Sequence, residues 1–247
     1  MSSLCSKLDE FQQVWDRRYE LLRRWKEEGR TIFGYCYCDL PLEIVHAAGI
    51  LPIQFTESGE TRHHELGTSQ SADYFCDHAQ YIVGQGLDGV YAPLHGVIFA
   101  HSCETMRMVA SVWELQVPVQ FFYFMPTAMK RNDINRTFLS AEYHALQRAI
   151  EGFVGHKITP AKLRASIEVY DTNRTLVRNL YQLRFERRLG LSEAELNTAV
   201  RAGWVMPVER HNDMLRGLLS EGSEAGSSEE TPKVRIMLSG FSPEHCM

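Results

Sequence analysis

The spacing of hydrophobic positions changes several times along the chain, which predicts alternating helices and strands. Between residues 4 and 28, apolar residues recur every three or four positions among charged ones, a pattern typical of an amphipathic helix. Short apolar or β-branched runs follow at 31–38, 50–56, 96–102 and 118–125, and their composition is that of buried strands. Because helical patterns separate these runs, we predict an α/β fold built on a parallel sheet with many helices.

A polar stretch, residues 57–71, separates the second predicted strand from a helix predicted over 72–86. It contains two glycines and an adjacent pair of histidines, a composition that favours an exposed loop. Adjacent residues do not share a helix face, so we interpret His63 and His64 as solvated side chains and not as a metal site.

The second half of the chain has helical periodicity. Long amphipathic segments cover 137–153 and 160–187, and Thr159 is a suitable N-cap for the second because proline follows it at the first helical position. Ser192 and Glu195 have the spacing of a capping box, which predicts the start of a further helix.

A stretch rich in glycine, serine and glutamate, residues 222–232, predicts a flexible acidic linker between two regions. We expect an N-terminal α/β domain with a helical array over 1–221 and the first strand of a second α/β domain over 233–247. The strand itself is KVRIMLSG, residues 233–240. A buried strand needs a crossover and further strands, so the interpretation is that the chain is a fragment ending just inside that domain. The alternative is that the strand joins the first sheet.

Composition narrows the possible classes of protein. The 247 residues carry 26 Lys and Arg against 31 Asp and Glu, a net charge of -5, which argues against a dedicated nucleic-acid binder. No apolar run approaches the ~20 residues of a membrane span, and the N-terminus has no apolar signal region. We therefore expect a cytoplasmic protein with neither a nucleic acid nor a membrane as its partner. No GxxxxGK[ST] phosphate loop is present.

The chain has six cysteines, and their spacing does not include a CxxC pair. They are Cys5, Cys36, Cys38, Cys76, Cys103 and Cys246. A single free cysteine is most often a buried small hydrophobe. Cys103, however, lies between a predicted strand and a helix, in the crevice where open α/β sheets bind ligands, and a helix N-terminus favours a thiolate. Cys76 lies at a loop-to-helix junction and could face the same crevice.

Three stretches in register resemble one family. Gly34–Pro52, GYCYCDLPLEIVHAAGILP, contains a Gly-Tyr pair, a Pro-x-Glu-Ile motif and an Ala-Ala-Gly-x-x-Pro motif. Cys76 in DYFCDHAQYIVG precedes Cys103 in FAHSCETMRMVASVW by 27 positions, and Gly155–Leu180 is similar to a helix–Thr–helix–Tyr–Asn–x–x–Arg pattern. On these motifs, from about residue 33 to 240, the chain resembles the 2-hydroxyacyl-CoA dehydratase / benzoyl-CoA reductase family.

The resemblance implies two Rossmann-like halves, of which this chain contains the first and barely begins the second. It also implies a [4Fe–4S] cluster held by three cysteines, the first two matching Cys76 and Cys103. The third family position lies well inside the second half, so Cys246 comes too early to match it. The third ligand is therefore missing from the expected pattern, and in a full-length chain Cys246 would be an improvised replacement.

Family chemistry is the low-potential, one-electron reduction of an acyl-CoA thioester. The resemblance implies a heteromer with a related subunit, and electrons supplied by a separate ATP-hydrolysing iron–sulfur activator. Residues 102–124 resemble the benzoyl-CoA reductase subunits more than the dehydratases, which implies an ATP-driven benzoyl-CoA reductase-type subunit acting on an aromatic acyl-CoA. The aromatic strand at 120–124 fits an aromatic acyl group and equally an ordinary core strand. A subunit of an (R)-2-hydroxyacyl-CoA dehydratase is the alternative, and a non-catalytic scaffold without a complete cluster site is a third reading. A fourth is a zinc protein that uses Cys36, Cys38, Cys76 and Cys103.

Two candidate catalytic groups flank the cysteines. Glu43 and His46 lie one turn apart on a predicted short helix, where an acid–base pair or a structural contact is expected. His101, two residues before Cys103, would point the same way as Cys103 if the strand continued that far. It would then donate to a cluster sulfur or a thioester carbonyl, or be an ordinary buried histidine. Cys36 and Cys38 alternate along a strand and share a face, where core packing is the better interpretation.

Overall fold

The computed structural model describes residues 3–36, 40–128, 130 and 132–224. These residues form two compact units. The sheet unit comprises Tyr19–Ser166, and the helical unit comprises the described parts of Met1–Arg18 and Ile167–Met247. Over the described ranges, none of the helices is both long and apolar enough to cross a lipid bilayer. Cys38, Cys246 and the predicted strand at 233–240 lie outside the described residues.

The sheet unit contains a four-stranded sheet in the order β2-β1-β3-β4, in which every neighbouring pair is parallel. The strands are β1 (Ile32–Cys36), β2 (Leu51–Gln54), β3 (Gly96–Ala100) and β4 (Phe121–Met125). Phe33 pairs with Pro52 on one side and with Gly96 on the other. The predicted parallel α/β fold is therefore confirmed.

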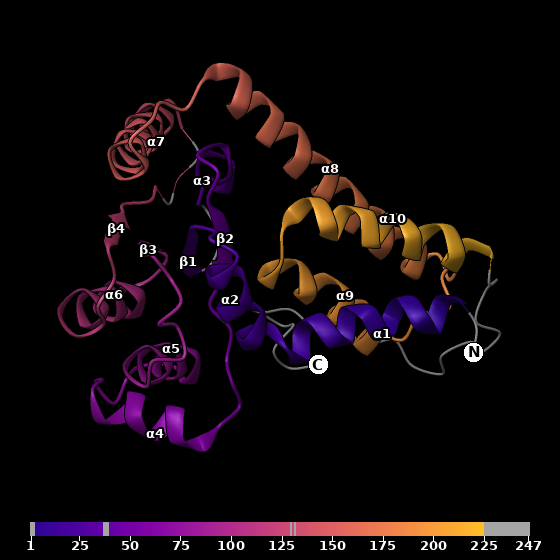
Figure 1. The fold of residues 1–247 in the computed structure, drawn as a ribbon, viewed down its shortest axis with the longest axis horizontal. Helices are drawn as coiled ribbons and strands as arrows, with labels where there is room; N and C mark the ends of the chain where they lie inside the picture. The colour runs from indigo at the N-terminus through magenta and orange to yellow at the C-terminus, as the bar shows by residue number, and fades with distance from the viewer. Residues whose placement is uncertain (1–2, 37–39, 129, 131, 225–247) are drawn as a thin grey trace. The chain divides into compact units, whose positions relative to one another are not determined.

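Helices cover both faces of this sheet. The helices of the sheet unit are α2 (Arg18–Glu27), α3 (Leu42–Ala47), α4 (Thr61–Ser69), α5 (Asp77–Leu87), α6 (Glu104–Gln116) and α7 (Asp133–Val154), and α4 packs on α5. Figure 1 shows α3 and α7 on one face and α5 and α6 on the other. Phe33, Ile98 and Met125 pack under α3 and α7, whereas on the other face Phe99 packs against Trp113 of α6. Each such side chain contributes about 1.5–3 kcal/mol by burial.

Helix α4 replaces part of the loop predicted at 57–71, so that prediction was wrong. Its polar, glycine-containing sequence carries little helical signal, and the packing against α5 stabilises it. A Cβ on Gly67 would strike the Gln80 carbonyl, and one on Gly84 would strike the His63 carbonyl, so the two backbones are in direct contact. His63 is consequently buried, with its ring nitrogens on Ser58 Oγ at 2.7 Å and Asp88 Oδ2 at 3.0 Å, and the prediction that it is solvated was also wrong.

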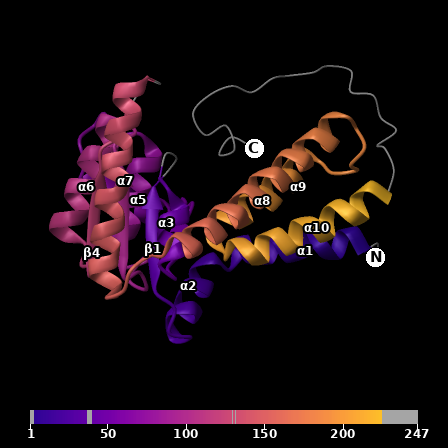
Figure 2. The same ribbon diagram turned by 90° about the horizontal axis from the view of Figure 1, so that it is seen from above.

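The helical unit is formed by α1 (Ser3–Asp16), most of α8 (Pro160–Phe185), α9 (Glu193–Ala202), the 3₁₀ turn η1 (Gly203–Val205) and α10 (Val208–Glu224). Helix α1 packs against α9 and α10 (Figure 2). The predicted N-cap bond of Thr159 and the predicted capping box at Ser192 are both present. The single helix predicted over residues 4–28 is interrupted after Asp16 and continues as α2.

The domain boundary predicted after residue 221 falls within helix α10. Helix α10 runs to Glu224, so the first three residues of the predicted linker at 222–232 are helical. The region 1–221, predicted as one α/β domain with a helical array, is divided between the two units. The linker beyond 224 and the second domain at 233–247 stay predictions.

Candidate functional site

The strand order creates a switch point between β1 and β3. The chain leaves β1 through α3 to reach β2, and it leaves β3 through α6, on the opposite face, to reach β4. Connections that diverge in this way leave a crevice at the carboxyl ends of the two strands, which is where open parallel sheets bind ligands. Cys36 ends β1, and Cys103 follows the end of β3 by three residues.

Cys103 is the N-cap residue of α6 and is exposed. Its backbone is extended, with φ -158° and ψ 170°, and its Sγ accepts a hydrogen bond from the Met106 amide at 3.4 Å. An N-cap acceptor satisfies one of the amides that a helix leaves unpaired at its start. A helix N-terminus also suits an anionic ligand bound at this position.

Cys76 occupies the corresponding position on α5. It is the exposed N-cap residue of that helix, and its side chain makes no capping hydrogen bond. Helix α5 leads into β3, so it runs against the strands and begins at their carboxyl ends. Because α5 and α6 pack on the same face, the fold places the first turns of both helices, each with an exposed thiol, at one edge.

Cys36 lies between these helices at the end of β1. It is 1% exposed, in agreement with the core-packing interpretation. Its Sγ lies 3.3 Å from Met106 Sδ in the first turn of α6 and 3.9 Å from His78 Nε2 in the first turn of α5. The other ring nitrogen of His78 lies 2.9 Å from Glu57 Oε1. Sequence reasoning missed Glu57 and His78, although the position of His78 two residues after Cys76 was a usable signal.

The two exposed thiols fit an iron–sulfur cluster in ligand type and in the charge that their helix ends favour. They supply two ligands. Within the described ranges, no group of three or more His, Cys, Asp or Glu side chains is arranged to hold a metal ion. A third cluster ligand is not found among the described residues, and the zinc alternative stays untested because Cys38 lies outside them. Cluster ligation by Cys76 and Cys103 stays a prediction.

His101 lies beside Cys103 but outside the strand, because β3 ends at Ala100. Its Nε2 lies 3.3 Å from Glu104 Oε1, and the other Glu104 oxygen accepts a hydrogen bond from Arg107 Nε at 2.9 Å. The Arg107 hydrogen bond, with a smaller contribution from His101, lowers the pKa of Glu104. The imidazole is thus paired with an exposed carboxylate at the start of α6, and its catalytic role stays a prediction.

Glu43 and His46 both lie on α3, as expected, on the other side of the sheet from α5 and α6. His46 Nδ1 lies 2.9 Å from Ser166 Oγ, so α8 engages this nitrogen. Glu43 is partly buried in the first turn, and its catalytic role stays untested.

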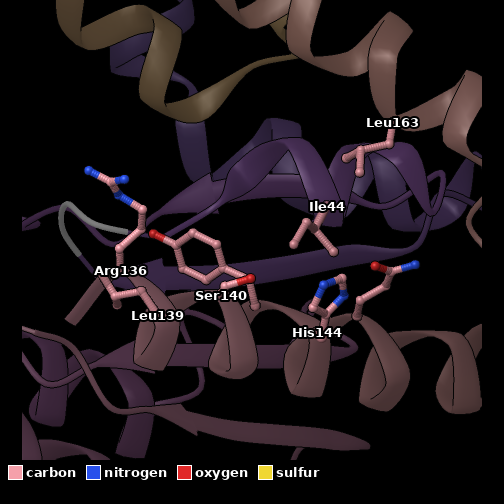
Figure 3. Close-up of a pocket in the computed structure, with 8 residues that line it drawn as sticks. Ile44, Arg136, Leu139, Ser140, His144 and Leu163 are labelled. Carbon is pink, nitrogen blue, oxygen red and sulfur yellow. The ribbon is translucent and has the colours of Figure 1, made fainter. Parts of the chain in front are cut away.

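A pocket of about 380 Å³ opens between α3, α7 and the start of α8 (Figure 3). Ile44, Tyr143 and Leu163 supply apolar walls, and Arg136 and His144 lie on its α7 side. Sequence reasoning did not predict this pocket, because its walls come from three separate segments.

The sequence of this chain is similar to those of several known proteins. A family model described as 2-hydroxyglutaryl-CoA dehydratase, D-component, matches residues 37–246. One of the subunits of benzoyl-CoA reductase from Thauera aromatica is 31% identical over 228 residues, which cover 91% of this chain and 59% of that protein.

Dehydratase subunits are similar at lower identity. Lactoyl-CoA dehydratase subunit beta of Anaerotignum propionicum is 26% identical, over 79% of this chain and 51% of its own length. The beta subunit of (R)-2-hydroxyglutaryl-CoA dehydratase of Acidaminococcus fermentans is 25% identical, over 89% of this chain and 58% of its own length. The chain thus spans between about half and three fifths of the length of these relatives.

Proposed function

The chain belongs to the family described as 2-hydroxyglutaryl-CoA dehydratase, D-component, and we propose that it is the iron–sulfur subunit of an ATP-driven benzoyl-CoA reductase-type complex. In this role it takes part in low-potential electron transfer to an aromatic acyl-CoA thioester. Its partners are a related family subunit and an ATP-hydrolysing iron–sulfur activator, and the complex is cytoplasmic.

One observation carries this proposal. Two exposed cysteines, Cys76 and Cys103, each cap the first turn of a helix, and both helices begin at the carboxyl edge of the same parallel sheet. A ligand site at this edge, with thiolates favoured by helix N-termini, suits an anionic iron–sulfur cluster.

Sequence identity supports the reductase over the dehydratase. The chain is 31% identical to the benzoyl-CoA reductase subunit and 25–26% identical to the two dehydratase subunits. The (R)-2-hydroxyacyl-CoA dehydratase subunit is therefore the second candidate.

The protein's own contribution is binding and orientation. A bound [4Fe–4S] cluster would supply one-electron chemistry at low potential. Cys76 and Cys103 would hold it at the first turns of α5 and α6, where a helix N-terminus suits an anionic group. The Met106 amide, already 3.4 Å from Cys103 Sγ, keeps that sulfur at the helix end.

The first experiment tests cluster binding. The chain is purified anaerobically with its related subunit, and iron and acid-labile sulfide are measured for wild type, Cys76→Ser, Cys103→Ser and the control Cys5→Ser. We expect about four irons per chain in wild type and control, as in one [4Fe–4S] cluster, and loss of most of this iron in the two site variants. A stably folded complex in which this chain carries no iron would instead favour the non-catalytic scaffold.

The second experiment tests the reaction. The complex, its activator, ATP and a reductant are incubated with benzoyl-CoA or with a 2-hydroxyacyl-CoA, and loss of aromatic absorbance is compared with dehydration. Dearomatisation supports the reductase. Dehydration without dearomatisation would overturn it in favour of the second candidate.

A further inference from the structure

A continuous set of side-chain contacts joins the two candidate ligand helices through the end of β1. It runs from Glu57 to His78, then to Cys36, and from Cys36 to Met106. Two of its members are buried, Cys36 at 1% and Met106 at 3% exposure, so the contacts lie beneath the edge that carries the exposed thiols.

The first contact fixes the imidazole. His78 Nδ1 lies 2.9 Å from Glu57 Oε1, and the His78 side chain is 11% exposed. An ionised carboxylate only accepts hydrogen bonds, so Nδ1 carries the hydrogen and Nε2 is turned toward Cys36 Sγ, 3.9 Å away. A carboxylate that orients a histidine in this way is a common support for metal sites.

The second contact reaches the other helix. Cys36 Sγ lies 3.3 Å from Met106 Sδ, and the Met106 amide donates to Cys103 Sγ. Cys36 belongs to a strand hydrogen-bonded on both sides, to β2 and to β3. It therefore links both helix ends to one of the two central strands of the sheet.

The spacing along each helix makes these contacts relevant to the site. His78 follows Cys76 by two residues, and Met106 follows Cys103 by three, so each contact lies within one turn of a candidate ligand. We infer that Glu57, His78 and Cys36 are positioning residues, which set the separation of Cys76 and Cys103 before a cluster is bound. This inference rests on the proposed function for the identity of the bound cluster. The contacts among Glu57, His78 and Cys36 do not depend on that function.

Cys36 is assigned to positioning and not to ligation because of its surroundings. Its sulfur is in contact with a thioether and an imidazole inside the sheet unit, whereas Cys76 and Cys103 are exposed. A rigid support for metal ligands typically changes metal affinity about 10–100-fold when it is removed.

The first test measures how firmly iron is held in the anaerobically purified complex. His78→Ala, Glu57→Gln and Cys36→Ala are expected to contain iron as isolated but to lose it to a chelator at about 10–100-fold lower chelator concentration than wild type. His78→Gln, whose amide can still bridge Glu57 and Cys36, is expected to recover part of this difference. The midpoint potential and the EPR line shape are expected to change in the alanine variants as well.

The matched control is His64→Ala. His64 lies on α4 and its Nε2 is 3.4 Å from Asp77 Oδ1, also in the first turn of α5 next to Cys76, but it is not part of the Cys36 contacts. We expect its iron retention and EPR spectrum to match wild type. Wild-type retention in all three positioning variants would overturn the inference. So would a Cys36→Ala complex purified without iron, because that result would make Cys36 a ligand.

The second test does not depend on a cluster. Nitroxide labels on Cys76 and Cys103, in a metal-free full chain with Cys5, Cys38 and Cys246 replaced by serine, report the distance between the two helix ends. We expect a narrow distribution with His78 and Cys36 present, a broader one in His78→Ala and Cys36→Ala, and no change in His64→Ala. Equal widths in all variants would overturn the inference. A His78-dependent width in a protein that never binds iron would overturn the proposed function alone.

Discussion

The cysteines at the carboxyl edge of the sheet and His211 of the helical unit differ in their exposure to solvent. At the carboxyl edge of the sheet, the cysteines that cap α5 and α6 are exposed. In the helical unit, His211 is 2% exposed and both ring nitrogens have partners, Asn173 Nδ2 at 2.8 Å and the Ala199 carbonyl at 2.9 Å. A saturated, buried histidine has no capacity for a ligand, whereas the sheet edge presents its sulfur atoms. The difference agrees with the proposed ligand site in the sheet unit and with a structural role for the His211 contacts in the helical unit.

The two units also differ in the kind of atom that lies against a closely packed glycine. In the sheet unit, Gly84 lies against the His63 backbone, and in the helical unit, Gly203 lies against the ring of His211. A backbone that is itself part of a helix cannot move aside as a side chain can.

The largest expected effect is therefore on Gly84. We expect Gly84→Ala to lower the free energy of unfolding by about 3 kcal/mol and to expose His63, because the new methyl group displaces α4 from α5. Gly203→Ala is expected to cost about 1–2 kcal/mol. Urea denaturation provides the comparison.

Gly152→Ala is the control for both glycine variants. A Cβ at this position in α7 meets no atom within 4 Å, so the substitution should be neutral or stabilise by about 0.5–1 kcal/mol through helix propensity. Equal destabilisation by all three substitutions would contradict the proposed role of backbone contact between α4 and α5.

The second prediction concerns the helical unit. Asn173 Nδ2 donates to His211 Nδ1 and to Asn212 Oδ1, both at 2.8 Å, so Asn173→Ala leaves two buried acceptors without their donor. We expect a loss of about 2–3 kcal/mol in the free energy of unfolding. Arg216→Ala, in the same unit, removes an exposed pair with Asp213 and should cost less than about 0.5 kcal/mol. Similar losses in the two variants would show that the network is not a main source of stability.

The third and smallest effect appears only in acid. Hydrogen bonds from Lys157, the Ile158 amide and Gln147, in that order, lower the pKa of Glu151 in the sheet unit to about 2 from 4.5. Because the folded pKa lies below the unfolded one, the stabilisation is complete above about pH 4.5 and is lost as the pH falls toward 2. The carboxyl titration followed by NMR should show a midpoint near 2, and Glu151→Gln should flatten the pH dependence of unfolding over this interval. A midpoint near 4.5 would contradict the assignment.

His211 provides the contrast to Glu151 in the helical unit. Burial lowers its pKa from 6.5, against a smaller opposing effect of its hydrogen bond to the Ala199 carbonyl. Its neutral form is therefore favoured by folding, and the associated stability is lost as the pH falls below about 6.5. As the pH falls, the stabilisation linked to His211 is thus lost at a higher pH than the stabilisation linked to Glu151. Amide hydrogen exchange measured as a function of pH would separate the two effects.

Local sequence signals identified much of the sheet unit. The change of period between apolar runs located the four strands of the described sheet and three of the helices between them, α3, α5 and α6, because alternation in a strand and recurrence in a helix are imposed by backbone geometry. Capping chemistry at Thr159 and Ser192 located two helix starts for the same reason. Cys76 and Cys103 were identified as candidate ligands through family motifs and through their positions at helix ends.

Helix α4, the burial of His63 and the contacts of Cys36 depend on the tertiary structure. Helix α4 and the burial of His63 depend on contact between two glycines and distant carbonyl groups, which no local pattern records. Glu57, His78, Cys36 and Met106 come from four separate elements, and only the strand order brings them together. Sequence by itself therefore determined the elements and the candidate ligands, since these depend on residues close in the chain. The support beneath the ligands required the fold, since its contacts join residues up to 70 positions apart.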